Sequence, residues 1–366
     1  MSTIKKAKEI VKTAFEKLKR FQSGEDKPFV TSDEKLNDAL LGGLFPKSVL
    51  VIAAISGGGK TTKLQQLEED FFNPVLNPNA DKHVLLRCNW EMSVFKLTLR
   101  KLKMVLKRKL TDILYNPVAE EDKDTYNNIF LQEASDRVFY MEEPTDPDTW
   151  FKDCDEFLQK HKKAKMVLIT VDHIALVKDT FGGKKRSMDT LIEFMNILTN
   201  RYDNVAFIAL SQLNREIENR KDVHTLAPQR SDLYNTDTLF HIADVVLVLH
   251  NPHKLGHSRY MLVPSKQYVK HLKKYMLKPE NDRTNFATAD EKGNPYFFAH
   301  LLKTRDIDSM NLADHVDLYI TETGGEGTQS NTPPPPQETQ EPSLTKSYSK
   351  GIKDIKSLDE NLNIYN

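Results

Sequence analysis

The sequence lacks the features of a disulfide-rich fold, a membrane protein or a strongly basic nucleic-acid-binding protein. Its only cysteines are Cys88 and Cys154, and they form no Cys-x-x-Cys pair, which suits a reducing compartment. It has no apolar run of about 18 residues and no secretory leader. Lys plus Arg and Asp plus Glu each number 52, so a nucleic-acid site must be a local patch. We therefore expect a soluble, cytoplasmic protein with no membrane partner.

The most informative stretch is an apolar run that ends in a glycine-rich loop. Residues 48–62 read Ser-Val-Leu-Val-Ile-Ala-Ala-Ile-Ser-Gly-Gly-Gly-Lys-Thr-Thr. This pattern is typical of a buried strand feeding a phosphate-binding loop, where Lys60 reaches the β- and γ-oxygens and Thr61 binds Mg²⁺. Ala54 stands at the first glycine of the general pattern, and a simple strand-to-helix turn is the alternative interpretation. The residues expected to bind the nucleotide are Ser56, Gly57, Gly58, Gly59, Lys60, Thr61 and Thr62.

Three further apolar runs are each followed by a polar side chain. The strands expected at 83–88, 166–171 and 205–210 lead into Glu91, Asp172 and Gln212, in that order. Carboxyl ends of parallel strands form the ligand side of an open sheet. We therefore expect Glu91 to orient or deprotonate water, Asp172 to hold the Mg²⁺ shell and Gln212 to sense the γ-phosphate. The alternative roles are structural: Glu91 opening a helix and Asp172 capping a turn.

The alternation of strands and helices predicts an α/β fold, a mostly parallel sheet with helices on both faces. Apolar spacing indicates helices over 60–71, 92–109, 146–161 and 187–201. We expect Asp148 or Thr149 near the cap of the third helix. The polar segment 115–133 is expected to be a loop with a short helix, followed by a short strand at 138–141.

A basic amphipathic helix precedes this domain. Residues 3–21 contain seven Lys or Arg and two Glu. Apolar residues recur there at helical spacing, namely Ala7, Ile10, Val11, Ala14, Phe15, Leu18 and Phe21. Gly24, Asp26 and Pro28 then form a short hinge. The apolar stripe either packs on its own domain, which the helix taken alone favours, or binds a partner.

Five separate stretches resemble the DnaB-type replicative helicases, the hexameric RecA-like motors. The likeness extends in order over about residues 8–320, and the family also has Ala at the position of Ala54. The stretches are the phosphate loop within 44–62, Trp90-Glu91-Met92-Ser93, Ile-Ala-Leu-Ser-Gln-Leu-Asn-Arg-Glu-Ile-Glu at 208–218, Ser231-Asp232-Leu233 through Ala243-Asp244, and Lys303-Thr304-Arg305.

The resemblance implies a RecA-like P-loop NTPase that uses ATP and Mg²⁺. By this resemblance Glu91 is the catalytic base, and Lys303 and Arg305 belong to the motif that supplies a trans-acting arginine finger, Arg305. It also implies a homo-oligomer, a hexameric ring on single-stranded DNA with 5′–3′ polarity. A primase, a loader or another replisome protein is the implied partner. The N-terminal helix resembles the linker helix that docks on the adjacent protomer.

The sequence departs from the family at the DNA-binding loop. Residues 234–237 read Tyr-Asn-Thr-Asp, so the Arg, Glu and Gly that contact the DNA backbone in the family are missing. The electrostatic grip on DNA is weakened there, although Tyr234 can stack on a base. The candidate nucleic-acid residues are Arg215, Arg230, Tyr234 and Asn235. The family's N-terminal primase-binding domain has no counterpart in the sequence.

An insertion occupies about residues 251–296. It holds five Lys and no acidic residue between Lys266 and Lys278, and both a solvated loop and a compensating nucleic-acid contact stay open. The three histidines His250, His253 and His257 are not expected to bind zinc, because no Cys or carboxylate completes a four-ligand set.

We therefore predict a linker helix and hinge at 1–27, a RecA-like ATPase domain at 28–320 and a disordered Gly-, Ser- and Pro-rich tail at 321–366. The expected function is an ATP-dependent replicative DNA helicase that translocates on single-stranded DNA. A nucleotide-dependent DNA-binding scaffold or loader of the same fold, without unwinding activity, is the alternative, and a recombinase-like filament is the less favoured third.

Overall fold

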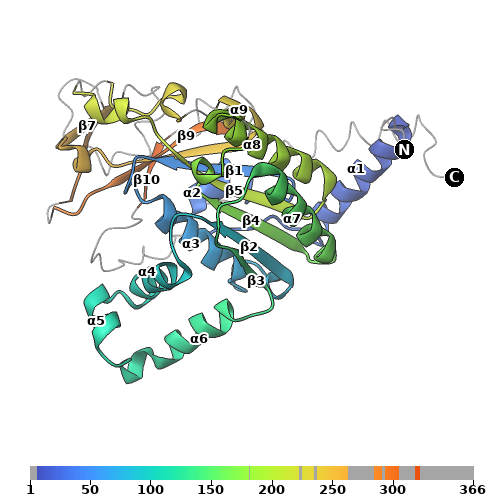
Figure 1. The fold of residues 1–366 in the computed structure, drawn as a ribbon, viewed down its shortest axis with the longest axis horizontal. Helices are drawn as coiled ribbons and strands as arrows, with labels where there is room; N and C mark the ends of the chain where they lie inside the picture. Colours follow the sequence, from blue (N-terminus) through green and yellow to red (C-terminus); the bar gives the residue numbers. More distant parts are fainter. Residues whose placement is uncertain are drawn as a thin grey trace, which may run out of the picture. The chain divides into compact units, whose positions relative to one another are not determined.

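The fold is built on one eight-stranded sheet of order β10-β9-β6-β1-β5-β4-β2-β3, shown in Figure 1. The computed structural model describes residues 6–180, 182–221, 225–234, 237–262, 284–290, 293–304 and 318–321. The strands of this sheet are β1 Val49–Ala54, β2 His83–Asn89, β3 Val138–Met141, β4 Met166–Asp172, β5 Val205–Gln212, β6 Val245–His250, β9 Phe297–Thr304 and β10 Leu318–Thr321. No described helix is both long and apolar enough to cross a membrane.

Six neighbouring strands, from β6 to β3, run parallel, and β9 and β10 extend the sheet in antiparallel fashion. Every residue of β1, β2, β4 and β6 is buried, as continuous apolar runs in a parallel sheet require. The prediction of a mostly parallel α/β sheet is confirmed.

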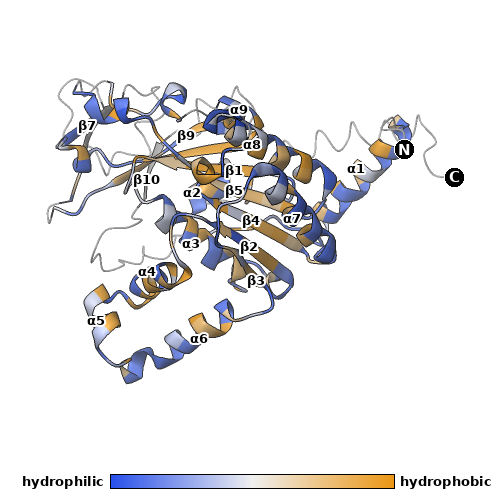
Figure 2. Cartoon of the chain, viewed as in Figure 1, coloured by the Kyte–Doolittle hydropathy of each residue, from blue (hydrophilic) through white to orange (hydrophobic). Residues whose placement is uncertain are grey.

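Helices cover both faces of this sheet. They are α2 Glu34–Ala39, α3 Lys60–Phe72, α7 Pro147–Lys160, α8 Lys184–Arg201 and α9 Asp237–Ile242. Side chains of β1 alternate between two cores: Val49 and Val51 pack with α7 and α8, whereas Leu50 and Ile52 pack with α3. Figure 2 shows the apolar strands between helices whose outer surfaces are polar.

The segment between β2 and β3 differs most from its prediction. It contains α4 Val94–Leu106, α5 Leu110–Tyr115 and α6 Lys123–Glu133, so 115–133 is more helical than expected. The first of these helices ends before 109 because Lys107 adopts a left-handed conformation with φ 52°. Short 3₁₀ turns lie at η1 Ala80–Lys82, η2 Glu120–Asp122, η3 Ile174–Leu176, η4 Arg215–Asn219, η5 Arg230–Asp232 and η6 His253–Leu255.

Helix α8 starts away from its predicted position, whereas α7 starts close to it. Helix α7 was predicted over 146–161 and is Pro147–Lys160; Asp146 is its N-cap, and its side chain accepts the N–H of Thr149, one of the two residues expected near the cap, at 3.0 Å. Helix α8 begins at Lys184 rather than 187.

Part of the insertion is folded. Strands β7 Arg259–Leu262 and β8 Thr284–Ala287 pair in antiparallel fashion, and Tyr260 is fully buried with its hydroxyl 2.8 Å from His300 Nε2. This described part is therefore not a solvated loop. Residues 263–283, which include Lys266 to Lys278, lie outside the described residues.

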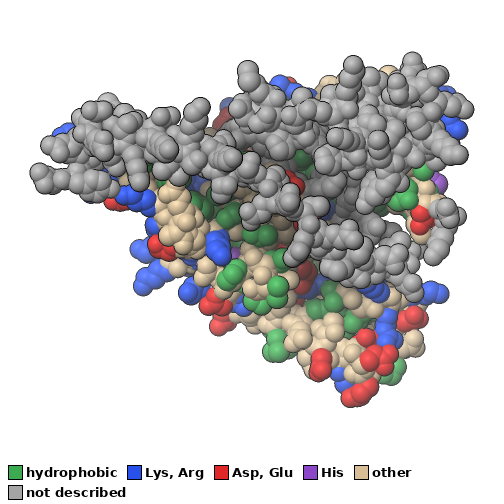
Figure 3. All heavy atoms as spheres, turned by 180° about the vertical axis from the view of Figure 1, so that it is seen from behind, with side chains coloured by type: hydrophobic (Ala, Val, Ile, Leu, Met, Phe, Trp, Pro, Cys, Tyr) green, Lys and Arg blue, Asp and Glu red, His purple; other side chains and the backbone are tan. Residues whose placement is uncertain are grey.

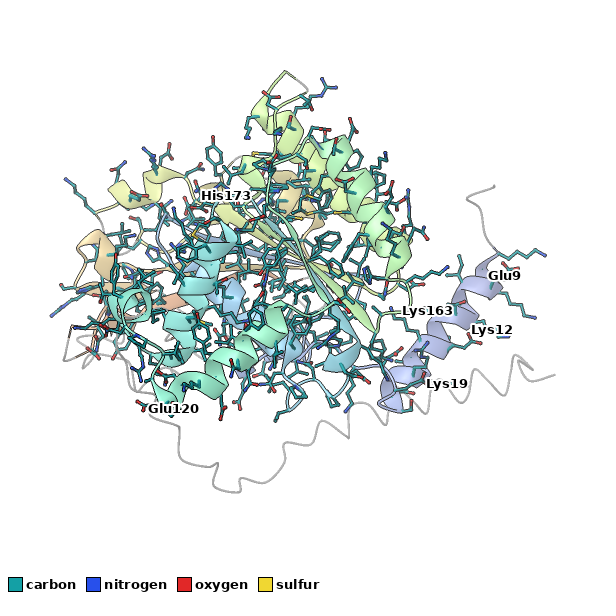
Figure 4. The ribbon with its side chains drawn as sticks, turned by 60° about the horizontal axis from the view of Figure 1, so that its bottom comes forward. Glu9, Lys12, Lys19, Glu120, Lys163 and His173 are labelled. Atoms are coloured by element: carbon teal, nitrogen blue, oxygen red, sulfur yellow. The ribbon has the colours of Figure 1, made fainter. Side chains whose placement is uncertain are left out.

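Helix α1 Ala7–Gln22 has no buried residue. Ile10, Val11, Phe15 and Leu18 are between 44% and 53% exposed, so the expectation that this stripe packs on its own domain was wrong for these four residues. Among the described residues, the end of the helix contacts the rest of the chain through the Phe21–Phe45 ring pair at 5.2 Å and through Arg20, which pairs with Asp26 at 2.9 Å. Figure 4 shows Glu9, Lys12 and Lys19 along this helix.

A buried ionic network fastens α6 to the sheet. Arg87 on β2 pairs with Glu68 of α3 at 2.9 Å and with Glu133 of α6, which also accepts from Lys101 of α4 at 2.6 Å. The Tyr140 hydroxyl donates to the same Glu133 carboxylate at 2.6 Å. Burial alone would raise the pKa of Glu133, but Arg87 and then Lys101 hold it down at about 2.

We expect Glu133→Gln to destabilise the fold by about 2–4 kcal/mol at pH 7, because each pKa unit corresponds to about 1.4 kcal/mol. The folded pKa of Glu133 lies below its ordinary 4.5, so its contribution is complete above pH 4.5 and is lost as the pH falls toward 2. Urea unfolding at pH 7 and pH 3.5 measures both effects.

Glu120 provides the matched control. Its side chain is 85% exposed and pairs with Lys123, so Glu120→Gln should change the unfolding free energy by well under 1 kcal/mol. A gap between wild type and Glu133→Gln that stays constant from pH 7 to pH 3.5 would contradict the role assigned to Glu133.

Candidate active site

The candidate site lies where the carboxyl ends of β1, β5, β4 and β2 meet. Strand registers place Ala54 beside Gln212 and Asn89 beside Asp172. Each strand therefore delivers its following polar residue to the same edge of the sheet, as expected for parallel strands. The structure brings together the phosphate loop, Glu91, Asp172 and Gln212.

The phosphate loop joins β1 to α3 and depends on its glycines. Gly57 and Gly59 have φ of 66° and 87°, conformations that side chains strongly disfavour. A Cβ on Gly58 would lie 2.8 Å from Ala54 Cβ, so the absence of a side chain at 58 makes room for the alanine at 54. The loop therefore tolerates Ala54 because Gly58 is a glycine.

Lys60 projects back into the loop from the first residue of α3. Its ammonium donates to the carbonyls of Ala54 and Ile55 at 3.0 and 3.1 Å, and the side chain is buried. Burial lowers the pKa of Lys60, while the carboxylates of Asp172 and Glu91 oppose that effect. A cation held at this position is placed to bind phosphate oxygens.

Thr61 and Asp172 form the candidate metal-binding pair. Thr61 Oγ1 donates to Asp172 Oδ2 at 2.9 Å, and Asp172 Oδ1 is buried with no hydrogen-bond partner in the described part of the chain. Burial raises the pKa of Asp172 to about 6, although the Thr61 hydroxyl opposes this. A hydroxyl beside a buried carboxylate with an unpartnered oxygen fits Mg²⁺, which prefers oxygen ligands.

Glu91 and Gln212 flank a residue that the sequence analysis did not single out, His173. Its Nε2 lies 3.4 Å from Gln212 Nε2 and 4.0 Å from Glu91 Oε2. The ring is buried, whereas the Glu91 side chain is 48% exposed. Burial lowers the pKa of His173, with the Glu91 carboxylate opposing. The position directly after Asp172 was the only sequence signal for it.

Lys254 is a second residue that the sequence analysis missed. It follows β6 and donates from Nζ to the Ser56 carbonyl at 2.9 Å. Its charge also lowers the pKa of Lys60. No local pattern signals this contact, because 198 residues separate the two partners.

The other predicted residues lie on neighbouring elements. Lys303 on β9 donates to the His241 carbonyl at 2.9 Å, and Arg230 stacks over the Phe240 ring at 4.5 Å. Arg215 is exposed, and Tyr234 is 41% exposed and donates its N–H to the Gln212 carbonyl at 3.0 Å. Arg305 and Asn235 lie outside the described residues.

The histidines considered for zinc contact different parts of the structure. His250 is buried in the core beside Tyr260, with ring centroids 5.4 Å apart, and His253 Nδ1 lies 3.4 Å from Thr288 Oγ1. Among the described residues no group of three or more potential metal ligands is assembled.

Comparison with known proteins gives distant sequence relatives. The replicative DNA helicase DnaB of Mycoplasma genitalium is 28% identical over 226 residues, which are 58% of this chain and 44% of that protein. DnaB of Mycobacterium leprae is 26% identical over 164 residues, 44% of this chain and 26% of that one. The match thus spans less than half the length of either relative.

Solved structures share the fold at low sequence identity. A solved ATPase domain of another protein superposes with a TM-score of 0.58 at 16% identity, covering 83% of this chain and 93% of that one. A DnaB-like replicative helicase, studied with its interactions with primase, gives a TM-score of 0.56 at 16% identity, covering 83% and 63%. The family model of the DnaB-like helicase C-terminal domain matches residues 30–278. The chain therefore belongs to the DnaB-like helicase C-terminal domain family.

Proposed function

We propose that this protein is an ATP-dependent replicative DNA helicase motor that translocates on single-stranded DNA as a ring. The observation that carries the proposal is the convergence of Lys60, the Thr61–Asp172 pair, Glu91 and Gln212 on one sheet edge. Membership of the family supports ATP hydrolysis.

Each residue at this edge has a distinct task in phosphoryl transfer to water. The loop N–H groups and Lys60 bind the β- and γ-phosphates, and Glu91 accepts the proton of the attacking water. Gln212 contacts the γ-phosphate. Thr61 and Asp172 would hold Mg²⁺, which neutralises charge on the phosphate oxygens. Because Glu91 is half exposed, water has access to its carboxylate.

The proposal includes a residue supplied by a neighbouring copy. Lys303, the next-to-last residue of β9, donates its ammonium to α9 carbonyls of its own chain, so the end of this strand is fixed two residues before Arg305. We assign Arg305 to the neighbour's site as its arginine finger, a role that contributes about 10³–10⁵ in rate.

Oligomerisation is assigned to α1. Its exposed stripe of Ile10, Val11, Phe15 and Leu18 needs an apolar partner surface. Exposed apolar side chains also gather on α4, α5, α6 and the turns that join them, namely Phe95, Leu110, Leu114, Tyr115, Val118, Phe130 and Leu131. We propose that α1 of one copy docks on this second surface of the next. Since the donor and acceptor surfaces differ, the contact is head-to-tail, which gives a ring when the rotation between copies closes. We propose that it closes as a hexamer, by family likeness.

The proposed contact with DNA involves few exposed candidate residues. On the face shown in Figure 3, acidic and basic side chains are interspersed among hydrophobic ones over the described residues. Arg230 stacks on Phe240 but its side chain is still 48% exposed, so Arg215, Arg230 and Tyr234 are the exposed candidates. Because residues 234–237 lack the Arg that contacts DNA in the family, a nucleotide-dependent scaffold or loader is the second candidate function. A primase or loader partner belongs to the proposal through the family alone.

We expect Lys60→Ala to abolish ATP binding and turnover, because it removes the cation held inside the phosphate loop. Glu91→Gln should lower turnover by about 10²–10⁴-fold while ATP still binds, since only the proton acceptor is lost. Steady-state hydrolysis and binding of a fluorescent ATP analogue measure the two effects. Wild-type turnover by Glu91→Gln would refute the assignment of the base.

Hydrolysis assays with and without single-stranded DNA, followed by strand displacement on a forked duplex, separate the two candidate functions. A helicase motor shows DNA-stimulated hydrolysis and displaces the strand. Hydrolysis indifferent to DNA, with no displacement, favours the scaffold instead.

We expect Phe15→Asp to convert rings to monomers. Burying one large apolar side chain contributes about 1.5–3 kcal/mol, and a carboxylate there adds a desolvation cost at every contact around the ring. Lys12→Asp is the matched control, because Lys12 is 78% exposed on the polar side of the same helix. Light scattering with ATP measures the mass of each variant. Equal masses for Phe15→Asp and wild-type rings would rule out docking through the stripe.

A further inference from the structure

We propose that His173 is a positioning residue that couples the γ-phosphate sensor Gln212 to the general base Glu91. The inference deepens the proposed ATPase function and rests on it. His173 touches neither the phosphate loop nor the metal-binding oxygens in any described contact. Its role is therefore to act through its two neighbours.

The placement of the imidazole carries the inference. His173 follows the last residue of β4, at the carboxyl edge of the sheet, where Figure 4 labels it. Its Nε2 lies 3.4 Å from the Gln212 amide nitrogen and 4.0 Å from the nearer Glu91 carboxylate oxygen. The ring is only 6% exposed, so its position is fixed by packing rather than by solvent.

One ring nitrogen serves both neighbours. Nδ1 is buried and has no hydrogen-bond partner within the described residues, so Nε2 makes all of the polar contacts. In a neutral imidazole Nε2 either accepts or donates a hydrogen bond, and the other nitrogen takes the opposite role. When Gln212 donates to Nε2, the ring proton sits on Nδ1 and Glu91 receives nothing. When Gln212 turns away, Nε2–H can donate to Glu91.

Because Nε2 bonds to Gln212 or to Glu91 but not to both, the γ-phosphate contact of Gln212 can change the hydrogen bonding of Glu91. A γ-phosphate that accepts the Gln212 amide hydrogens draws the amide away from Nε2. His173 then holds one oxygen of Glu91, and the other oxygen stays free to accept a proton from water. Both imidazole forms are neutral, so the exchange leaves the net charge unchanged: Nδ1 releases its proton to water and Nε2 takes one up from water. Without His173, Glu91 is a half-exposed side chain with no other described partner to fix its direction.

Two variants of His173 distinguish a polar role from a packing role. Glutamine carries an amide nitrogen at roughly the position of Nε2, whereas leucine fills similar space with no polar atom. We expect His173→Leu to lower kcat about 10- to 100-fold, the usual effect of losing a hydrogen bond to a charged group, with the Kd of a fluorescent ATP analogue within about twofold of wild type. His173→Gln should restore kcat to within about threefold.

Coupling is tested by combining His173→Leu with Gln212→Ala. If both residues act along one path, the double variant has nearly the kcat of the slower single variant. Losses that multiply would overturn the coupling. Equal impairment of His173→Gln and His173→Leu, together with weaker binding of the analogue, would show a merely structural role and overturn it as well.

Wild type and Glu91→Gln are measured in parallel, so failure of the proposed function can be told apart from failure of the role proposed for His173. Absence of hydrolysis by the wild type would refute the proposed function and this inference with it. Hydrolysis by the wild type, loss of activity in Glu91→Gln and full kcat in His173→Leu would overturn only the role of His173.

Discussion

The register of the buried parallel strands is the constraint on which the candidate site depends. Strands β1, β5, β4 and β2 are buried throughout most of their length, so none of them can slip without exposing its apolar residues. The pairing of Ala54 with Gln212 and of Asn89 with Asp172 is therefore fixed by the core. Side chains far apart in sequence reach hydrogen-bond distance, such as Thr61 and Asp172, because the strands below them cannot move.

Much of this arrangement follows from sequence because each strand carries its own signal. The apolar runs predicted β1, β2, β4 and β5 to within one or two residues, and the polar residues after them were correctly placed at one edge. Local chemistry was less decisive at helix ends. Asp146 caps α7 from just before Pro147. The mostly polar sequence of α6 gave little helical signal, and the half-buried Glu133 anchors this helix through Arg87 and Lys101.

Long-range contacts were beyond the reach of pattern reasoning. Lys254 meets Ser56 across the sheet only because β6 lies next to β1, and strand order is not encoded in any short motif. His173 was missed for a different reason. Asp172 already explained why a polar residue ends this strand, so the next residue attracted no interpretation. The structure shows that Gln212 and Glu91 both lie near His173 Nε2. The spacing of the apolar residues in α1 predicted this helix correctly, but the sequence does not identify the surface that would cover them.

The charges of the site also bear on the proposed contribution of a second copy. Within the described residues, the charged groups that act on Lys60 are Asp172, Glu91 and Lys254, so two cations face two carboxylates. Such a site has no net charge of its own. A nucleoside triphosphate with bound Mg²⁺ carries roughly two negative charges. More negative charge builds up on the leaving oxygen and on the oxygens of the γ-phosphoryl group as the bond between them breaks. In the proposed mechanism the loop N–H groups of one chain stabilise the ground state, and the described residues add no further cation for that developing charge. An arginine from a neighbouring copy would meet this requirement and would tie catalysis to assembly through the proposed head-to-tail contact that covers the apolar stripe of α1.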